Sequence, residues 1–202
     1  MPQAGNRSQM SETGSAMDRL LGALGNGKTR GLPPVERWNP PFCGDLDMRI
    51  ASDGTWFYLG TPIGRPALVK LFSSVLWREG GDYFLVTPVE KVGIKVEDAP
   101  FQAVEMAVSG EGDGRSIAFR TQVDEVVNVD GEHPIRFERS SSAGVKPYVH
   151  VRRDLWARVT RALTYDLLAL GEVREVDGAR QFGVAVARAF YVVAPASEIE
   201  GL

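Results

Sequence analysis

Short segments of alternating apolar and polar residues, interrupted by Gly and Pro, constrain the fold of this chain more than any other feature of its sequence. They are clearest in residues 47–101, where a strand, a tight turn, a strand, an amphipathic helix and two further strands follow one another. The 22 Gly and 12 Pro among 202 residues favour many short strands and turns over a helical bundle. The sequence therefore predicts a β-rich α+β fold with antiparallel sheets.

Composition narrows the expected surroundings and partners. The formal net charge of -3 gives no overall field that would gather nucleic acid or an anionic membrane, so nucleic acid is not an expected partner. Cys43 is the single cysteine, which excludes an intramolecular disulfide and is typical of a reducing compartment. No apolar run approaches the roughly 20 residues needed to cross a bilayer, and the first residues lack a secretory signal pattern. We therefore expect a cytoplasmic protein that does not contact membranes.

Two segments are expected to precede the folded units. Residues 1–14 are polar and have no periodic apolar face, so we expect a disordered arm. Residues 15–44 are interpreted as a helix that begins at Ser15, followed by a Pro-rich extended connection. The apolar face of that helix consists of Met17, Leu20, Leu21 and Leu24.

Residues 45–100 are expected to form the first α+β unit. Asp53-Gly54 is typical of a hairpin turn between two strands. A helix is predicted to begin at Pro66 and to continue to the glycine pair 80–81. Strands are predicted at residues 47–51, 55–59, 83–87 and 91–97.

Residues 101–202 are expected to form a second, related unit. A helix capped by Asp154 is predicted, and Asp177-Gly178 indicates a later hairpin. Arg65 precedes the predicted helix of the first unit as Arg152 precedes that of the second, which we interpret as a duplicated strand-helix-strand core. Further strands are predicted at residues 101–108, 116–121, 134–138 and 148–152.

Four long motifs occupy residues 38–50, 53–65, 68–76 and 85–101, and the arm of residues 1–14 lies outside them. In these motifs the chain resembles a bacterial family catalogued as domain of unknown function 1285. The resemblance implies two small duplicated α+β units, of which the C-terminal one is superficially like a pleckstrin-homology fold. It also implies a ligand site at the junction of the units and a role in signal transduction, with a nucleotide-type ligand.

Cationic and aromatic side chains lie where the predicted elements could hold a small anionic ligand, because cations bind phosphate and aromatic faces stack on a base. An alternative is that Arg49 and Arg65 pair with nearby acids while Trp56 fills the core. The first interpretation predicts a non-enzymatic ligand-binding or signal-transduction protein, which also has a signalling protein as a partner. Its candidate ligand contacts are Arg49, Trp56, Tyr58, Arg65, Lys91, Tyr148, His150 and Arg152.

Two other functions stay open from the sequence. Glu90, Glu97 and Asp98 could serve a hydrolase as a carboxylate cluster, although their spacing is more typical of a charged solvent face. A protein-interaction scaffold would instead use the exposed edges of the sheets. The sequence contains no metal-ligand spacing and no glycine loop for phosphate, so no catalytic residue, cofactor or metal site is predicted. Cys43 is either a redox-sensing thiol or, as is usual for free cysteine, a buried residue.

Overall fold

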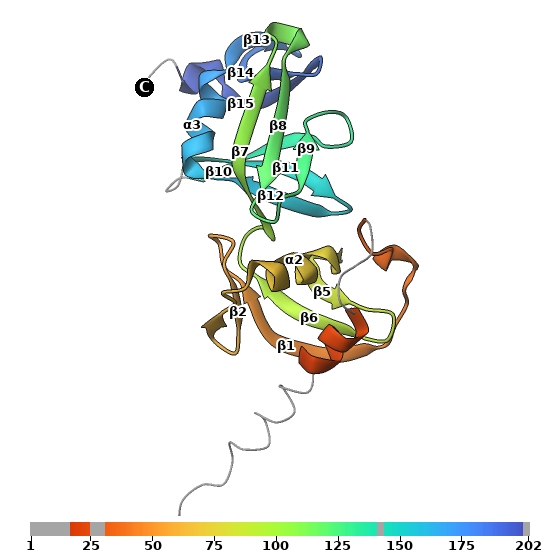
Figure 1. The fold of residues 1–202 in the computed structure, drawn as a ribbon. Coiled ribbons are helices and arrows are strands. Elements are labelled where there is room, and N and C mark those ends of the chain that lie inside the picture. The colour runs from red at the N-terminus through yellow and green to blue at the C-terminus, as the bar shows by residue number, and fades with distance from the viewer. Residues whose placement is uncertain (1–16, 25–30, 141–143, 200–202) are drawn as a thin grey trace, which may run out of the picture. The chain divides into compact units, whose positions relative to one another are not determined.

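The computed structural model describes residues 17–24, 31–140 and 144–199 (Figure 1). The predicted arm of residues 1–14 lies outside this part of the chain. The structure divides between Asp98 and Ala99 into two compact units, which are described separately below. No helix in the described residues is long and apolar enough to span a bilayer.

The first unit is built on a six-stranded sheet with the strand order β3-β2-β1-β6-β5-β4. The two central strands, β1 and β6, run parallel, and their outer neighbours are antiparallel to them. The helix α2, Pro66–Ser74, connects the two halves of the sheet. The strands are β1 (Phe42–Ile50), β2 (Trp56–Tyr58), β3 (Thr61–Pro62), β4 (Leu76–Glu79), β5 (Asp82–Val86) and β6 (Lys91–Val96).

One face of this sheet forms the core of the first unit. Met48 and Ile50 are buried, as the alternation in β1 predicts, and Trp56 stacks on Phe72 of α2 with 6.3 Å between ring centroids. A helix over residues 17–24 is present as expected, and its Leu20 is fully buried. The core therefore consists of one sheet face covered by short helices.

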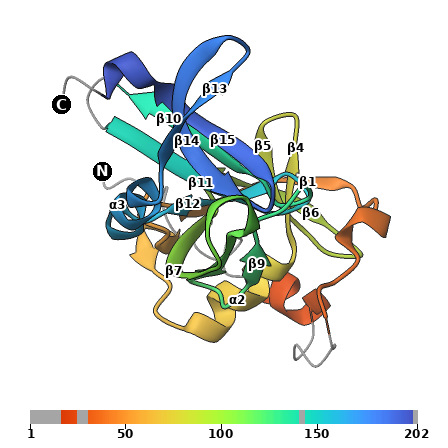
Figure 2. The same cartoon turned by 90° about the horizontal axis from the view of Figure 1, so that it is seen from above.

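The second unit repeats the six-stranded sheet and adds a smaller one. Its large sheet has the order β10-β11-β12-β7-β8-β9, again with a parallel central pair, β12 and β7. The helix α3, Arg161–Ala169, contacts β7, β11 and β14 (Figure 2). The strands are β7 (Phe101–Ser109), β8 (Ser116–Thr121), β9 (Val126–Asn128), β10 (Ile135–Ser140), β11 (Gly144–Arg152), β12 (Leu155–Val159), β13 (Glu172–Val176), β14 (Ala179–Val186) and β15 (Ala189–Pro195). Short 3-10 helices lie at Val35–Arg37, Gly112–Gly114 and Ala196–Glu198.

The two large sheets follow the same path, which supports the predicted duplication. In each, three strands run from the centre to one edge, and three more return from the other edge to the centre. The helices do not occupy equivalent places, because α2 lies between the third and fourth strands and α3 follows the sixth. The duplication is thus seen in the strand order of the two sheets and not in the positions of the helices. The fold class is α+β, as predicted.

The helix predicted from Pro66 to the glycine pair 80–81 is wrong in its second half. The structure ends α2 at Ser74, and residues 76–79 form β4, where Leu76 pairs with Leu85. The hydroxyls of Ser73 and Ser74 donate to carbonyl oxygens three residues earlier, at 2.8 and 2.6 Å. Such bonds compete with helix continuation, and the pairing with β5 decides the outcome.

The helix predicted to begin at Asp154 is wrong in its first half. Residues 155–159 form the strand β12, and α3 begins only at Arg161. Leu155 and Val159 lie four positions apart, a spacing that falls on one face of a helix and equally on one face of a strand. The burial of Ala157 between them shows the two-residue period of a strand. Arg152 is therefore followed by a strand, whereas Arg65 is followed by a helix, so the predicted correspondence between these two arginines is wrong as well.

Both predicted hairpin turns are confirmed. Around Asp53-Gly54, Ile50 pairs with Trp56, and Gly54 has a φ of 85°. The carboxylate of Asp53 accepts the N–H of Thr55 at 2.8 Å. At the second turn, Asp177 and Gly178 have φ values of 51° and 77°, the left-handed conformations that a two-residue turn requires.

Candidate functional site

The aromatic residues predicted to stack on a ligand lie mostly in the protein interior. Trp56 and Tyr148 are fully buried, and the contact of Trp56 with Phe72 is the core packing expected under the structural alternative. Tyr58 is half-buried, and burial raises its pKa, with the carboxylates of Asp18 and Asp47 adding to the effect.

Two of the predicted cations on the first unit are engaged by acids and rings of the same unit. Arg49 forms an ion pair with Glu97 and lies 4.3 Å above the ring of Phe57. Lys91 donates to Glu79 at 2.6 Å, and its ammonium lies 4.6 Å from the ring centroid of Phe84. Arg49 is thus paired with an acid, as the alternative interpretation expects, but the acid is Glu97 and not Asp47, Asp53 or Glu90; the pairing of Lys91 was not predicted.

Arg65 differs from these two cations in its environment. It occupies the N-cap position of α2 with an extended backbone and is exposed. No ion pair of Arg65 is found among the described residues. Its guanidinium is thus accessible on the surface of the first unit.

The predicted residues of the second unit are held in a tight polar framework. Both ring nitrogens of His150 lie within hydrogen-bond distance of carbonyl oxygens, those of Glu132 at 2.8 Å and Arg153 at 2.5 Å. The side chain of Arg152 is only 10% exposed and pairs with Glu125 at 3.1 Å. Burial lowers the pKa of Arg152, although Glu125 opposes the shift. These two side chains are thus already occupied in linking neighbouring elements.

The three carboxylates considered for a hydrolase are engaged in different local contacts. Glu90 is buried, with Arg19 at 3.6 Å, whereas Glu97 pairs with Arg49 and accepts the N–H of Ser52 at 3.0 Å. Among the residues that the structure describes, no three His, Cys, Asp or Glu side chains are grouped as a metal ion would require. The expectation that Cys43 is buried is wrong, because its side chain is exposed.

A concave pocket on the second unit is lined by cations and one aromatic ring, and none of these residues is among the predicted ligand contacts. Lys146 on β11, Arg158 on β12, and Arg161 and Tyr165 on α3 line a cavity of about 580 Å³, which we call the basic pocket. No Asp or Glu is among the described residues that line it. Apolar and hydroxyl side chains complete its wall, namely Val145, Val159, Thr164 and Leu168.

Strand pairing and one helical turn position these charges. Tyr148 pairs with Arg158 across β11 and β12, so Lys146, two residues before Tyr148, belongs to the same face as Arg158. The guanidinium of Arg161 donates to the hydroxyl of Tyr165, one turn later, at 3.3 Å. This hydrogen bond raises the pKa of Arg161 and keeps the cation beside the ring.

The acid nearest to Lys146 along the ladder has a cation of its own. Glu138 of β10 pairs with Lys146 in the strand register, but its carboxylate contacts Arg136 at 3.3 Å. Because α3 also starts at this pocket, its first amide groups add a small positive potential. The basic pocket therefore favours an anion.

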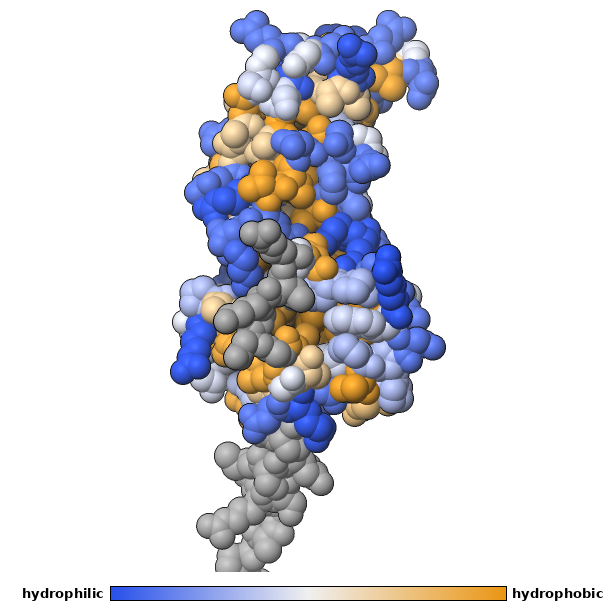
Figure 3. Space-filling view, turned by 45° about the vertical axis from the view of Figure 1, so that its right-hand side comes forward, coloured by the Kyte–Doolittle hydropathy of each residue, from blue (hydrophilic) through white to orange (hydrophobic). Residues whose placement is uncertain are grey.

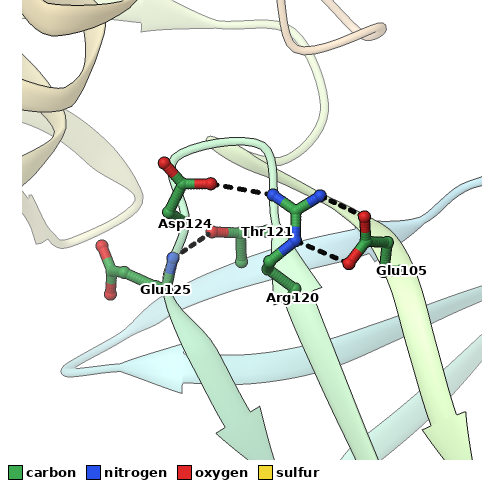
Figure 4. A network of polar contacts seen from close by, with 5 residues as sticks. All are labelled: Glu105, Arg120, Thr121, Asp124 and Glu125. Carbon is green, nitrogen blue, oxygen red and sulfur yellow. Dashed lines mark hydrogen bonds and ion pairs between the residues drawn. The ribbon is translucent and has the colours of Figure 1, made fainter.

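A charged cluster elsewhere in the second unit contains one cation and neighbouring acids, unlike the lining of the basic pocket (Figure 4). Arg120 lies between two carboxylates, with Nε 2.7 Å from Glu105 and Nη1 2.8 Å from Asp124. These acids raise the pKa of Arg120, and the bond to Arg120 lowers that of Glu105. The hydroxyl of Thr121 accepts the N–H of Glu125 at 3.1 Å. Arg120 is therefore neutralised by two neighbouring acids, whereas no acid is among the described residues that line the basic pocket.

The residues of the basic pocket were not predicted as ligand contacts, because the secondary structure around them was predicted wrongly. Arg158 falls within the helix predicted to begin at Asp154, and Lys146 lies before the predicted strand of residues 148–152. The alternation of buried residues over 155–159 was the available signal, because as a strand it places Arg158 beside the β11 face.

Fold and site together define a class: an α+β protein of two units with duplicated six-stranded sheets and a basic pocket on the second. Residues 33–99 match the N-terminal domain of DUF1285, described as a domain of unknown function, and residues 100–193 match the C-terminal domain of that protein of unknown function. A DUF1285 family crystal structure from Silicibacter pomeroyi DSS-3 is 47% identical over 86% of this chain and 93% of the other, with a TM-score of 0.79. This chain therefore belongs to the DUF1285 family.

A second family structure, from Shewanella baltica OS155, is 28% identical over 61% of this chain and 91% of the other, with a TM-score of 0.49. A comparison with curated proteins finds none that matches.

Proposed function

We propose that this protein binds a small anionic ligand without converting it and relays its presence to a signalling protein in the cytoplasm. The observation that carries the proposal is the basic pocket, where three cations and an exposed ring line about 580 Å³ without a lining acid among the described residues. Small-molecule sites usually have volumes of roughly 300 to 1,000 Å³. The size and charge of the pocket both fit such a ligand.

A nucleotide-type ligand suits this arrangement because it combines a phosphate with a flat base. Arginine forks bind phosphate oxygens in pairs, and lysine adds a point charge. The ring of Tyr165, whose residue is 61% exposed, offers a stacking surface for the base. A ligand that contacts β11, β12 and α3 together would favour one arrangement of these elements, and that shift would be the signal.

Two finer expectations from the sequence are retained as proposals. One, implied by the family resemblance, is that the second unit is superficially like a pleckstrin-homology fold. The other is the ligand placement that uses Arg49, Arg65, Lys91 and Arg152. Arg65 is the most suitable residue for testing this second placement, because it is exposed and lies away from the core packing.

Calorimetric titration of the full chain with adenosine and guanosine monophosphates and with pyrophosphate tests the proposal. We expect binding that weakens as salt is raised, because exposed charge pairs are screened. Lys146→Ala and Arg161→Gln should each weaken it by on the order of tenfold, the loss of one charge-assisted hydrogen bond. Arg188→Gln, an equivalent charge change on the exposed β14–β15 turn, should leave it unchanged.

The outcomes separate the two placements. Loss of binding on Arg65→Ala, with no effect of Lys146→Ala, would favour the placement expected from the sequence and contradict the basic pocket. The absence of binding to all three anions at low salt would contradict anion binding at this pocket.

The hydrolase and scaffold alternatives stay predictions. A hydrolase would require Glu90, Glu97 and Asp98 to act on one substrate, while Glu90 and Glu97 have separate cationic neighbours. For a scaffold, hydrophobic residues do reach the surface of both units beside hydrophilic ones (Figure 3). Phe42 and Val126 are among the exposed apolar residues.

A further inference from the structure

We propose that a second cavity, on the first unit, binds a small apolar molecule that carries one ammonium group. This cavity has a volume of about 490 Å³ and its described lining is mainly apolar. The inference does not depend on the basic pocket, which lies on the second unit and is lined by other residues. The described lining residues of this ammonium cavity are Arg19, Ala23, Cys43, Pro88, Val89 and Glu90.

The argument begins with an incompletely satisfied carboxylate. The side chain of Glu90 is only 7% exposed, and its Oε1 is buried without a hydrogen-bond partner among the described residues. Its Oε2 lies 3.6 Å from Nε of Arg19, which is an ion pair but too long for a hydrogen bond. Buried carboxylates are strongly disfavoured unless donors surround them, so Glu90 indicates a donor that the cavity can admit.

The backbone holds Glu90 in this position. The hydroxyl of Thr87, itself fully buried, accepts the N–H groups of Glu90 at 3.1 Å and Val89 at 3.3 Å. The N–H of Thr87 donates to the carbonyl of Glu90 at 2.9 Å, which closes the turn between β5 and β6. The carboxylate is therefore presented by a rigid turn, as a binding site requires. Oε1 itself is buried, so a ligand donor reaches it only when the carboxylate turns about its last torsion, which is soft in Glu.

The lining specifies the kind of ligand. An ammonium group donates charge-assisted hydrogen bonds to a carboxylate, which are stronger than those of a neutral donor. Ala23, Pro88 and Val89 provide an apolar surface for the rest of the molecule. Arg19 lies 3.6 Å from Oε2 of Glu90, so there is room in the charge balance for one ammonium group at most. An anion gains no hydrogen-bond donor from the carboxylate.

Cys43 provides a reporter inside the lining of this cavity. It is the single cysteine of the chain, and its thiol is exposed. A chromogenic aromatic disulfide reagent therefore labels one site, at a rate that depends on access to the cavity. We expect hexylammonium chloride to slow this labelling in a saturable way. Hexan-1-ol and sodium hexanoate, with the same alkyl chain at matched ionic strength, should not do so at the same concentrations.

Variants test whether Glu90 is the anchor. Glu90→Gln keeps the shape but removes the charge, so the apparent affinity for hexylammonium should fall on the order of tenfold. Glu79→Gln is the matched control, because it makes the same charge change in the same unit and lies outside the lining. Ala23→Phe should fill the cavity, slow labelling without ligand and abolish the effect of hexylammonium.

Three results would overturn the proposal. The first is that hexylammonium has no effect on labelling of the unaltered protein. The second is that protection is undiminished in Glu90→Gln, and the third is that hexan-1-ol protects equally well. Should Glu90→Gln prove unfolded by its thermal melt, Ala23→Phe decides the question, since undiminished protection there places the amine elsewhere.

Discussion

At the scale of single residues, several of the charged side chains predicted as ligand contacts form ion pairs within their own unit. Arg49 with Glu97, Arg152 with Glu125 and Lys91 with Glu79 are examples. The basic pocket and Glu90 stand apart, because like charges converge in the first and a buried oxygen lacks a described partner in the second. Function is therefore proposed at a pocket whose described lining has cations but no acid, and at a buried carboxylate oxygen without a described hydrogen-bond partner.

The turn residue Asp53 gives a prediction on pH. Hydrogen bonds from Thr55 lower the pKa of Asp53 from its ordinary value of 3.8. Because the pKa of Asp53 is lower in the folded protein than in the unfolded chain, its ionised carboxylate stabilises the fold at pH values above the unfolded pKa. This contribution is lost as the pH falls through the folded-state pKa. We expect Asp53→Asn to lower the thermal midpoint at neutral pH, with a difference from the unaltered protein that narrows below pH 3.8. A difference that stays constant from neutral to acidic pH would contradict this origin.

At the scale of elements, turns and strand ladders decide what each segment becomes. Residues 76–79 and 155–159 have apolar spacings that suit a helix. They form strands instead, because they pair with β5 and β11. The hairpin of β14 and β15 closes with Ala187 and Arg188 at φ values of 50° and 67°. These are left-handed conformations that residues with a Cβ adopt at a cost.

This turn gives a stability prediction. Arg188→Gly should raise the free energy of unfolding by about 1 kcal/mol, because glycine adopts the left-handed conformation without steric penalty. Arg188→Ala is the matched control, since it removes the same side chain but keeps Cβ, and it should give no such gain. Urea unfolding measures both. Equal stabilisation by the two variants would indicate that loss of the arginine charge, and not backbone strain, is responsible.

At the scale of the whole molecule, each unit contains its own core and its own sheets. The strand pairings found in the described residues all lie within one unit or the other. Phe101, Phe119 and Leu155 are fully buried in the second unit, as Trp56 and Phe72 are in the first. Each unit thus has the buried apolar surface that a domain needs.

We expect residues 99–202 alone to fold and to melt cooperatively, because no sheet of this unit needs a strand from residues 1–98 in the described part of the chain. Circular dichroism and thermal denaturation of the isolated unit test this. A broad, non-cooperative transition would show that the second unit depends on the first. The isolated unit should also keep the anion affinity of the full chain, because the basic pocket lies within it.

The α+β class and the hairpin turns at Asp53-Gly54 and Asp177-Gly178 could be predicted from the residues alone. These depend on local conformational preference and residue type, which neighbours along the chain specify. The grouping of Lys146, Arg158 and Arg161 depends on long-range contacts, because strand pairing places the first two on one sheet face and α3 adds the third. Spacing of four residues is shared by helices and strands, so the choice between them is made by the partner strand that supplies the hydrogen bonds.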